Sequence, residues 1–188
     1  MSKVKHPFGV IVNKEISDHL RSWRFIILML IIGLTCMGSL YTALNTIGTT
    51  VKPNTSFLFL RLFTASDGTL PSFIVFISFL GPLLGIALGF DAISSEQNKG
   101  TLSRILSQPI YRDYLLNAKF VAALTIVTIL LFALGFLVMG FGLIAIGIPP
   151  TADEFLRMIS DLRVSVLYVA FWLILSIFFS SCFKQAAT

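Results

Sequence analysis

Four long stretches without a charged residue constrain this sequence more than any other feature. They hold 27 residues between Arg24 and Lys52, 23 between Asp67 and Asp91, 33 between Lys119 and Asp153, and 20 between Arg163 and Lys184. The hydrocarbon core of a bilayer is about 30 Å thick and a helix rises about 1.5 Å per residue, so roughly 20 apolar residues cross it. The stretches therefore predict four membrane-spanning helices, near residues 25–44, 72–90, 120–146 and 164–183.

The composition indicates the same class of protein. Hydrophobic residues make up 56% of the 188 residues and charged residues only 12%, whereas a water-soluble domain carries about 25% charged residues. Helix is expected rather than strand, because lipid offers no partner to unpaired backbone groups and because the apolar runs are continuous instead of alternating. We predict an all-α membrane protein in which residues 25–188 form a bundle of four transmembrane helices.

A further apolar stretch, SFLFLRLF at residues 56–63, is too short to cross a membrane. It also carries Arg61 at its centre. A charged residue inside a span costs about 2.5 to 3.5 kcal/mol, while each Leu or Phe returns only a few tenths. We therefore predict that this stretch is an interfacial patch in the first loop.

The distribution of Lys and Arg predicts how the spans are oriented. Of the 14 basic residues, ten lie in residues 1–24, in the loop at 91–119 or at Lys184, and the other two loops hold four. Because basic loops stay in the cytoplasm, the N-terminus, the loop at 91–119 and the C-terminus are expected there, in a multi-pass protein of the cell membrane. The basic residues are dispersed and form no stripe, so we expect no nucleic-acid partner.

Residues 1–24 are predicted to form a cytoplasmic amphipathic helix on the inner membrane surface. Apolar residues recur there at helical spacing, and charged residues fall between them; the apolar set is Phe8, Ile11, Val12, Ile16, Leu20 and Trp23, and the charged set is Lys14, Glu15, Asp18 and Arg21. Pro7 suits the first turn of a helix. The alternative is a frayed basic leader.

The loop at residues 91–119, called the polar loop below, collects seven charged residues between two uncharged runs. Its pattern predicts a short helix that starts at a capping box, carries a small apolar face and stops at a proline: Ser94 with Gln97, then Leu102, Ile105 and Leu106, then Pro109. This helix is too short and too polar to span the membrane. Its apolar side either docks on a partner protein, dips into lipid or folds back under the bundle.

Two parts of the sequence resemble a known family. The polar loop, through Asp91, Glu96, Gly100, Thr101, Leu102, Pro109, Ile110, Arg112 and Lys119 in that order and spacing, resembles the cytoplasmic loop between helices 2 and 3 in permease subunits of ABC-2 type ATP-binding cassette transporters. The stretch VIVNKEISDHLRSWRFIILML, with Lys14 and Glu15 ahead of the first span, resembles the N-terminal helix of the same family. The resemblance covers nearly the whole chain.

The resemblance implies a function. In that family the short loop helix is a coupling helix, which docks on a separate ATPase subunit and transmits its closure to the membrane helices. The expected contact residues are Glu96, Gly100, Thr101, Leu102, Ile105, Leu106, Pro109 and Arg112. The family implies an exporter, a second permease copy or homologue as dimer partner, and ATP and Mg bound by the ATPase. Gln97 stands where family members often have Arg, which puts a charge pairing at that position in doubt.

The family fold usually has six membrane helices, and this sequence ends five residues after its fourth predicted span. We therefore expect the sequence to be a C-terminally truncated part of a longer protein. The transported substrate, and whether the dimer is a homodimer or a heterodimer, cannot be read from these residues.

No pattern of a catalytic or metal site is present in the sequence. It has no phosphate-binding glycine loop, so ATP must be hydrolysed by another subunit, and it has no HExxH or nucleophile-elbow motif. Cys36 and Cys182 are isolated thiols in the first and fourth predicted spans, which makes a metal site or a disulfide improbable. We expect no catalytic residue, no metal ligand and no cofactor bound by this chain itself.

Three glycines at four-residue spacing, Gly81, Gly85 and Gly89, are the predicted helix-packing residues of the second span. Pro82 among them should kink the helix. Glycine is common in membrane helices, and packing inside one subunit is as good an explanation as dimerisation. Two other functions stay open beside the permease: a membrane-embedded enzyme acting on lipid or peptide, and a scaffold that binds an ATPase without moving a substrate.

Overall fold

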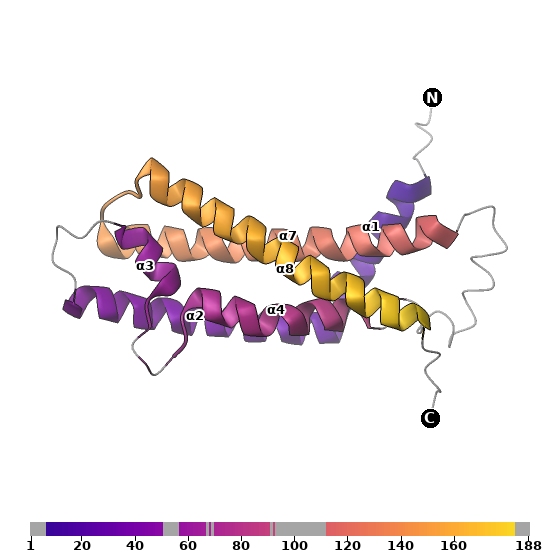
Figure 1. The fold of residues 1–188 in the computed structure, drawn as a ribbon, viewed down its shortest axis with the longest axis horizontal. Helices are drawn as coiled ribbons and strands as arrows, with labels where there is room; N and C mark the ends of the chain where they lie inside the picture. The colour runs from indigo at the N-terminus through magenta and orange to yellow at the C-terminus, as the bar shows by residue number, and fades with distance from the viewer. Residues whose placement is uncertain are drawn as a thin grey trace. The chain divides into compact units, whose positions relative to one another are not determined.

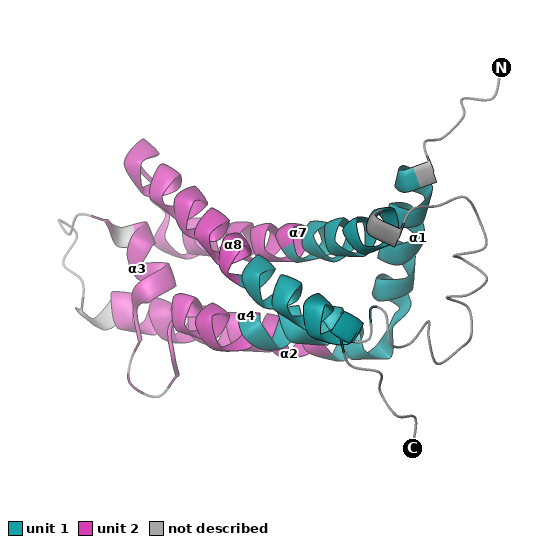
Figure 2. Ribbon diagram, turned by 45° about the vertical axis from the view of Figure 1, so that its right-hand side comes forward, with its two compact units in different colours: residues 1–27, 82–127, 169–188 teal, residues 28–81, 128–168 magenta. Residues whose placement is uncertain are grey.

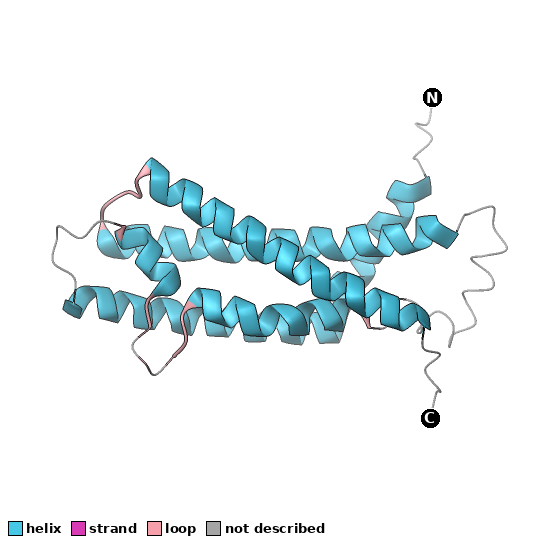
Figure 3. Cartoon of the chain, viewed as in Figure 1, coloured by secondary structure: helices cyan, strands magenta, loops and turns pink. Residues whose placement is uncertain are grey.

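The computed structural model describes residues 7–50, 57–66, 68, 70–90, 92 and 112–182. Within these ranges the chain forms six α-helices and no strand (Figures 1 and 3). The helices are α1 (Pro7–Arg21), α2 (Trp23–Thr50), α3 (Leu58–Thr64), α4 (Phe73–Gly89), α7 (Arg112–Ile146) and α8 (Ala152–Cys182). The prediction of an all-helical protein is confirmed for the described residues. The predicted coupling helix lies outside them.

Three of these helices are long and apolar enough to cross a membrane: Trp23–Ile47 within α2, Tyr114–Ile146 within α7, and Ala152–Cys182, which is α8. α4 is apolar and free of charged residues but has 17 residues, about 25 Å of helix at 1.5 Å per residue. Its length is at the lower end of what spans a bilayer. A count of four spans therefore remains a prediction.

The helices extend beyond the predicted spans. α7 begins at Arg112 rather than near residue 120, and α8 begins at Ala152 rather than near residue 164. An uncharged stretch marks the part of a helix that tolerates lipid, whereas the helix itself continues until its backbone is capped or broken. α7, with 35 residues, is about 52 Å long, so part of it must project beyond a bilayer core.

Local sequence explains the turn between α7 and α8. Gly147 has a φ of 76°, a left-handed conformation that glycine adopts without strain, and its N–H donates to the carbonyl of Leu143 at 2.9 Å. α8 then starts with a capping box. The Oγ1 of Thr151 accepts from the N–H of Glu154 at 3.3 Å, and the Glu154 carboxylate accepts in return from the N–H of Thr151 at 2.9 Å.

The chain divides into two compact units, which Figure 2 shows in teal and magenta. Unit 1 consists of residues 1–27, 82–127 and 169–188, and unit 2 of residues 28–81 and 128–168. In unit 1, small side chains let the helices approach each other: Ala118 and Ala122 of α7 are fully buried. Larger side chains, Leu84 of α4 and Leu173 of α8, fill the core of the same unit.

Unit 2 contains α3, which lies in the stretch that we predicted to be an interfacial patch. Three apolar side chains of α3, Phe59, Leu62 and Phe63, are buried, and Arg61 is exposed. The ring of Phe63 meets that of Phe73 edge-on, with centroids 5.2 Å apart. The short helix therefore contributes to the core of unit 2 and keeps its one charge at the surface, which explains why an arginine is tolerated there.

Many large apolar side chains are exposed on the surface of the described helices. Only 33–44% of the candidate spans is buried inside the protein. Water would not tolerate so much exposed apolar surface, but lipid does. The outward set includes Leu30, Leu34 and Tyr41 of α2, Phe79 of α4, Ile129 and Ile144 of α7, and Leu167, Phe171 and Phe178 of α8.

Candidate functional site

Most of the predicted contact residues of the polar loop lie outside the described residues: Glu96, Gly100, Thr101, Leu102, Ile105, Leu106 and Pro109. Arg112 is described as the first residue of α7. The structure therefore does not test the predicted contact surface. It does describe the helix into which the polar loop leads, and the side chains that hold the first turns of that helix.

The first turns of α7 are joined to α1 by a buried ion pair within unit 1. The Nζ of Lys119 lies 2.9 Å from the Oε2 of Glu15 and donates a hydrogen bond to it, across 104 positions of the sequence. The side chains of Lys119 and Glu15 are only 6% and 8% exposed. Burying a charged side chain costs free energy because the charge loses its hydration. Attraction between two opposite charges at this distance offsets that cost, whereas a single buried charge would have no such compensation.

A second cation and a histidine surround this pair. The Nζ of Lys14 lies 3.5 Å from the Oε1 of Glu15 and 3.6 Å from the Oδ2 of Asp18. His19 follows Glu15 by one helical turn. Burial lowers the pKa of His19 below its usual value of 6.5; Glu15 opposes this shift and Lys119 adds to it. The neutral imidazole is therefore favoured next to the ion pair.

A ring contact holds the same two helices near their N-terminal ends. Phe8 of α1 and Tyr114 of α7 meet edge-on, with centroids 6.0 Å apart and planes 76° apart, an arrangement that aromatic pairs prefer. α1 is thus attached to α7 at two points along its length, an aromatic one and an ionic one.

The burial of Glu15 does not follow from the amphipathic pattern of α1. Leu20 and Trp23, on the predicted apolar side, are 52% and 77% exposed, an exposure that lipid tolerates. Glu15 belongs to the predicted polar positions, yet it is buried. The reason is a partner that no local pattern reveals, because Lys119 is distant in sequence. The location of α1 on the membrane surface stays a prediction.

The predicted packing glycines belong to α4. Within unit 1, a Cβ added to Gly85 would lie 3.0 Å from the backbone N of Leu173, and one added to Gly89 would lie 2.8 Å from the Cβ of Ser176. The Oγ of Ser176 donates to the carbonyl of Ile86 at 3.0 Å. The backbones of α4 and α8 therefore approach closely here. Gly81 is buried in the part of α4 that belongs to unit 2.

A carboxylate missed by the sequence reasoning organises unit 2. The Oε1 of Glu154 accepts from the backbone N–H of Phe59 at 3.0 Å, while its Oε2 accepts from the N–H and hydroxyl of Thr151. One buried side chain thus caps two helices, α3 and α8. The TxxE spacing of residues 151–154 could have revealed the capping of α8, but nothing in the sequence indicated the bond to α3.

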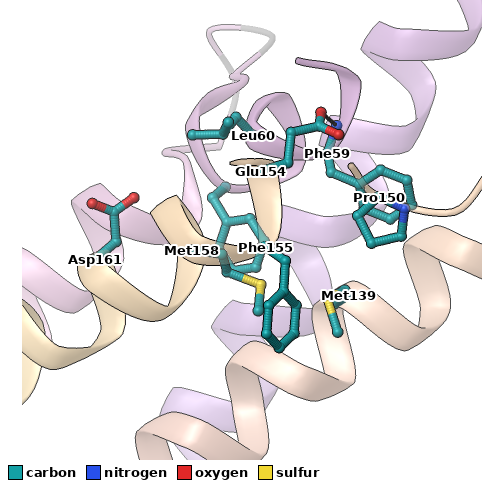
Figure 4. Close-up of a pocket in the computed structure, with 9 residues that line it drawn as sticks. Phe59, Leu60, Met139, Pro150, Glu154, Phe155, Met158 and Asp161 are labelled. Atoms are coloured by element: carbon teal, nitrogen blue, oxygen red, sulfur yellow. Dashed lines mark hydrogen bonds between the residues drawn. The ribbon is translucent and has the colours of Figure 1, made fainter. Parts of the chain in front are cut away.

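A small pocket lies beside Glu154 in unit 2 (Figure 4). Its walls are aromatic and thioether side chains from α3, α7 and α8, including Phe59, Met139, Phe155 and Met158, and Asp161 completes the rim. The empty volume is about 280 Å³, open solvent included. This is below the usual range of about 300 to 1,000 Å³ for ligand pockets, so the pocket does not define a ligand site.

The described residues show no arrangement typical of an enzyme or metal centre. No group of three or more His, Cys, Asp or Glu side chains in the searched, described part of the chain could hold a metal ion. Cys36 and Cys182 are free thiols, the first buried and the second exposed. The buried carboxylates of Glu15 and Glu154 instead join helices to one another.

Long apolar helices with an outward-facing aliphatic surface are typical of a multi-pass membrane protein, and comparison with known sequences gives its family. Residues 10–188 match the family described as ABC-2 family transporter protein, and the chain belongs to this family. Proteins of this family are membrane components of ABC transporters, and the permeases among them in general work with an ATPase partner.

Two curated relatives of this chain share one description with each other. The chain is 29% identical over 161 residues to a probable ABC transporter permease protein NosY of Pseudomonas aeruginosa, an alignment that covers 86% of this chain and 50% of the relative. It is 30% identical over 111 residues to a probable ABC transporter permease protein NosY of Stutzerimonas stutzeri, covering 59% of this chain and 36% of the relative. The chain thus spans about half the length of the curated relatives or less. No solved structure matches it.

Proposed function

We propose that this chain is the membrane-spanning permease part of an ATP-driven exporter, in which a separate ATPase subunit binds ATP and Mg and supplies the energy. The match of residues 10–188 to the ABC-2 transporter family is the observation that carries the proposal. Export is the direction that the family resemblance implies.

The ATPase is proposed to act through the polar loop. The spacing of Leu102, Ile105 and Leu106 predicts an apolar face that a partner protein could cover, on a segment too short and too polar to span the membrane. α7 supports the proposal, since it begins at Arg112 and continues unbroken to Ile146. A movement of the polar loop would therefore be transmitted to the membrane along one continuous helix.

The proposed topology has four spans, with α4 as the second and both termini in the cytoplasm. α4 is uncharged and packs closely on α8 through Gly85 and Gly89. The bias of basic residues toward residues 1–24 and the polar loop supports the orientation. A second permease copy or homologue is the proposed dimer partner, and the outward apolar side chains offer surface for it and for lipid.

The substrate class is inferred from the absence of charge in the predicted spans. The four uncharged stretches offer aliphatic, aromatic, glycine and hydroxyl side chains. Such a lining suits an amphiphilic or apolar cargo better than a bare ion, which would need carboxylates or other ligands at membrane depth. The identity of the cargo would follow from transport assays with the assembled complex.

Copurification with the ATPase tests the proposal. The full permease would be expressed with its ATPase partner, purified, and assayed for ATP hydrolysis. We expect the permease to retain the ATPase and stimulate it, and Glu96→Ala or Leu102→Asp to abolish the stimulation without loss of membrane insertion. Leu156→Asp, at an exposed position of α8, is the matched control and should leave it intact. Stimulation that survives both loop substitutions would contradict the assignment.

A further inference from the structure

The Glu15–Lys119 ion pair lies in the first turns of α7, where a displacement of residues 91–111, the part of the polar loop before α7, would first arrive. Lys119 is on α7, seven positions after Arg112, and α7 is helical throughout. Seven residues of helix amount to about 10 Å, a length over which a helix is stiff. Lys119 must therefore move with the start of α7, and Glu15 is the side chain bound to it.

α1 can pass such a movement on to the first predicted span. α1 ends at Arg21 and α2 begins at Trp23, with Ser22 as the single residue between them. The backbone continues its hydrogen bonding through this joint, since the N–H of Ser22 donates to His19 at 3.0 Å and its carbonyl accepts from Ile26 at 3.1 Å. A joint of one residue, with backbone hydrogen bonds to both helices, restricts the movement of α1 relative to α2.

We propose that Glu15 and Lys119 are positioning residues that make α1 follow α7, so that one movement of the polar loop drives the helices after it and the helix before the first span together. The inference rests on the proposed function, because the displacement would come from the ATPase partner. Neither residue touches ATP or substrate in this account.

An ion pair is suited to this role because it is specific in direction and distance. A buried pair is a weak source of stability, and apolar side chains of similar size often hold two helices as well or better. A shifted apolar contact, however, leaves no buried charge without its partner. Sliding α1 by one helical turn, about 5.4 Å, would separate Lys119 from Glu15 and break their buried ion pair, whereas Lys14, on α1 itself, would stay beside Glu15. The pair therefore fixes the register of α1 on α7.

Four variants of the full permease in complex with its ATPase separate this role from simple packing. The single changes Glu15→Met and Lys119→Met each leave one buried charge. The double change Glu15→Met with Lys119→Met removes both charges and keeps an apolar contact. The exchange Glu15→Lys with Lys119→Glu restores an ion pair of opposite direction. Membrane insertion, recovery of the complex and thermal unfolding of each variant are measured beside permease-stimulated ATP hydrolysis.

The two double variants give the decisive comparison. We expect both to be recovered as intact complexes, the methionine pair with stimulation lowered at least about fivefold, as for a coupling energy of about 1 kcal/mol or more, and the exchanged pair with stimulation within about twofold of the original. A methionine pair that folds and stimulates like the original protein would overturn the proposal. So would an exchanged pair that folds but remains as impaired as the single variants.

Leu102→Asp in the same assay distinguishes failure of this inference from failure of the proposed function. If Leu102→Asp abolishes stimulation while the methionine pair has no effect, the polar loop couples the ATPase and the ion pair does not. If the permease never stimulates the ATPase, or does so regardless of Leu102, the proposed function fails and the role of Glu15 and Lys119 fails with it.

Discussion

The hydroxyl of Tyr168 on α8 donates a hydrogen bond of 3.1 Å to the backbone carbonyl of Ser78 on α4. In a regular helix this carbonyl would accept from the N–H of residue 82, but residue 82 is Pro and has no N–H. Tyr168 thus occupies the position that the proline leaves open. Lipid would offer the carbonyl no replacement.

Replacing Tyr168 with Phe should destabilise the protein by about 0.6 kcal/mol and by no more than about 1.7 kcal/mol, the average and the maximum found for interhelical hydrogen bonds in a membrane protein. Replacing Pro82 with Ala restores the missing N–H, so Tyr168→Phe should cost almost nothing in that background. Unfolding of the four proteins of this double-mutant cycle in detergent measures the difference. Equal costs in both backgrounds would mean that Tyr168 does not compensate for Pro82.

Removing the Glu154 carboxylate, which caps both α3 and α8, should destabilise the N-terminal ends of these two helices. Glu154→Ala leaves the N–H groups of Phe59 and Thr151 without their acceptor, and each lost cap costs about 0.5 to 2 kcal/mol. The control is Asp153→Ala, which breaks only an exposed ion pair with Arg157 and should cost less than about 1 kcal/mol. A loss no larger at Glu154 than at Asp153, measured by unfolding, would contradict this role.

Close packing of α4 on α8 predicts different outcomes for two glycines. At Gly89, an added methyl would meet the Cβ of Ser176 and the carbonyl of Leu173, which cannot rotate away, so Gly89→Ala should cost about 1 to 3 kcal/mol. At Gly140 nothing lies within 4 Å, and Gly140→Ala should be neutral or stabilise the helix by up to about 1 kcal/mol. Thermal unfolding of the two variants would measure both changes in stability, and equal changes would refute close packing at Gly89.

The buried position of His19 predicts a loss of stability in acid. Its pKa is lowered in the folded protein, chiefly by burial, with Lys119 adding to the shift and Glu15 and Asp18 opposing it. The unfolded chain therefore binds a proton first as the pH falls through about 6.5. The stability from neutral His19 is complete above that pH and declines below it.

His19→Gln cannot be protonated and serves as the comparison. Between pH 8 and pH 5 the unfolding temperature of the original protein should fall more than that of the variant, and the gap should open only below about pH 6.5. Parallel pH profiles for the two proteins would show that His19 is not the group responsible.

The helices were largely predictable because apolar length is a local property. The uncharged stretches located parts of α2, α4, α7 and α8, and Pro7 marked the first residue of α1. The early start of α8 was missed because residues 152–163 are polar enough to resemble a loop, although the capping box at Thr151 signals a helix there. A span pattern describes what lipid tolerates and says little about helix ends.

The contacts that organise the two units were not predictable, since they join residues distant in sequence. Nothing near Glu15 indicates a buried carboxylate, and only the fold brings Lys119 within 2.9 Å of it. The hydrogen bond from Phe59 to Glu154 also joins residues that are distant in sequence. The contact residues predicted in the polar loop, from Glu96 to Pro109, lie outside the described residues and stay predictions.

Docking of the polar loop on the ATPase places Leu102 at the contact, and crosslinking from position 102 examines that contact itself. A photoreactive phenylalanine analogue at Leu102, in the full permease bound to its ATPase, should give a covalent permease–ATPase product on illumination. The same analogue at Ile144, 81% exposed on α7, should give none. An intact complex in which position 102 crosslinks only to lipid, or is labelled from outside intact cells, would contradict the account.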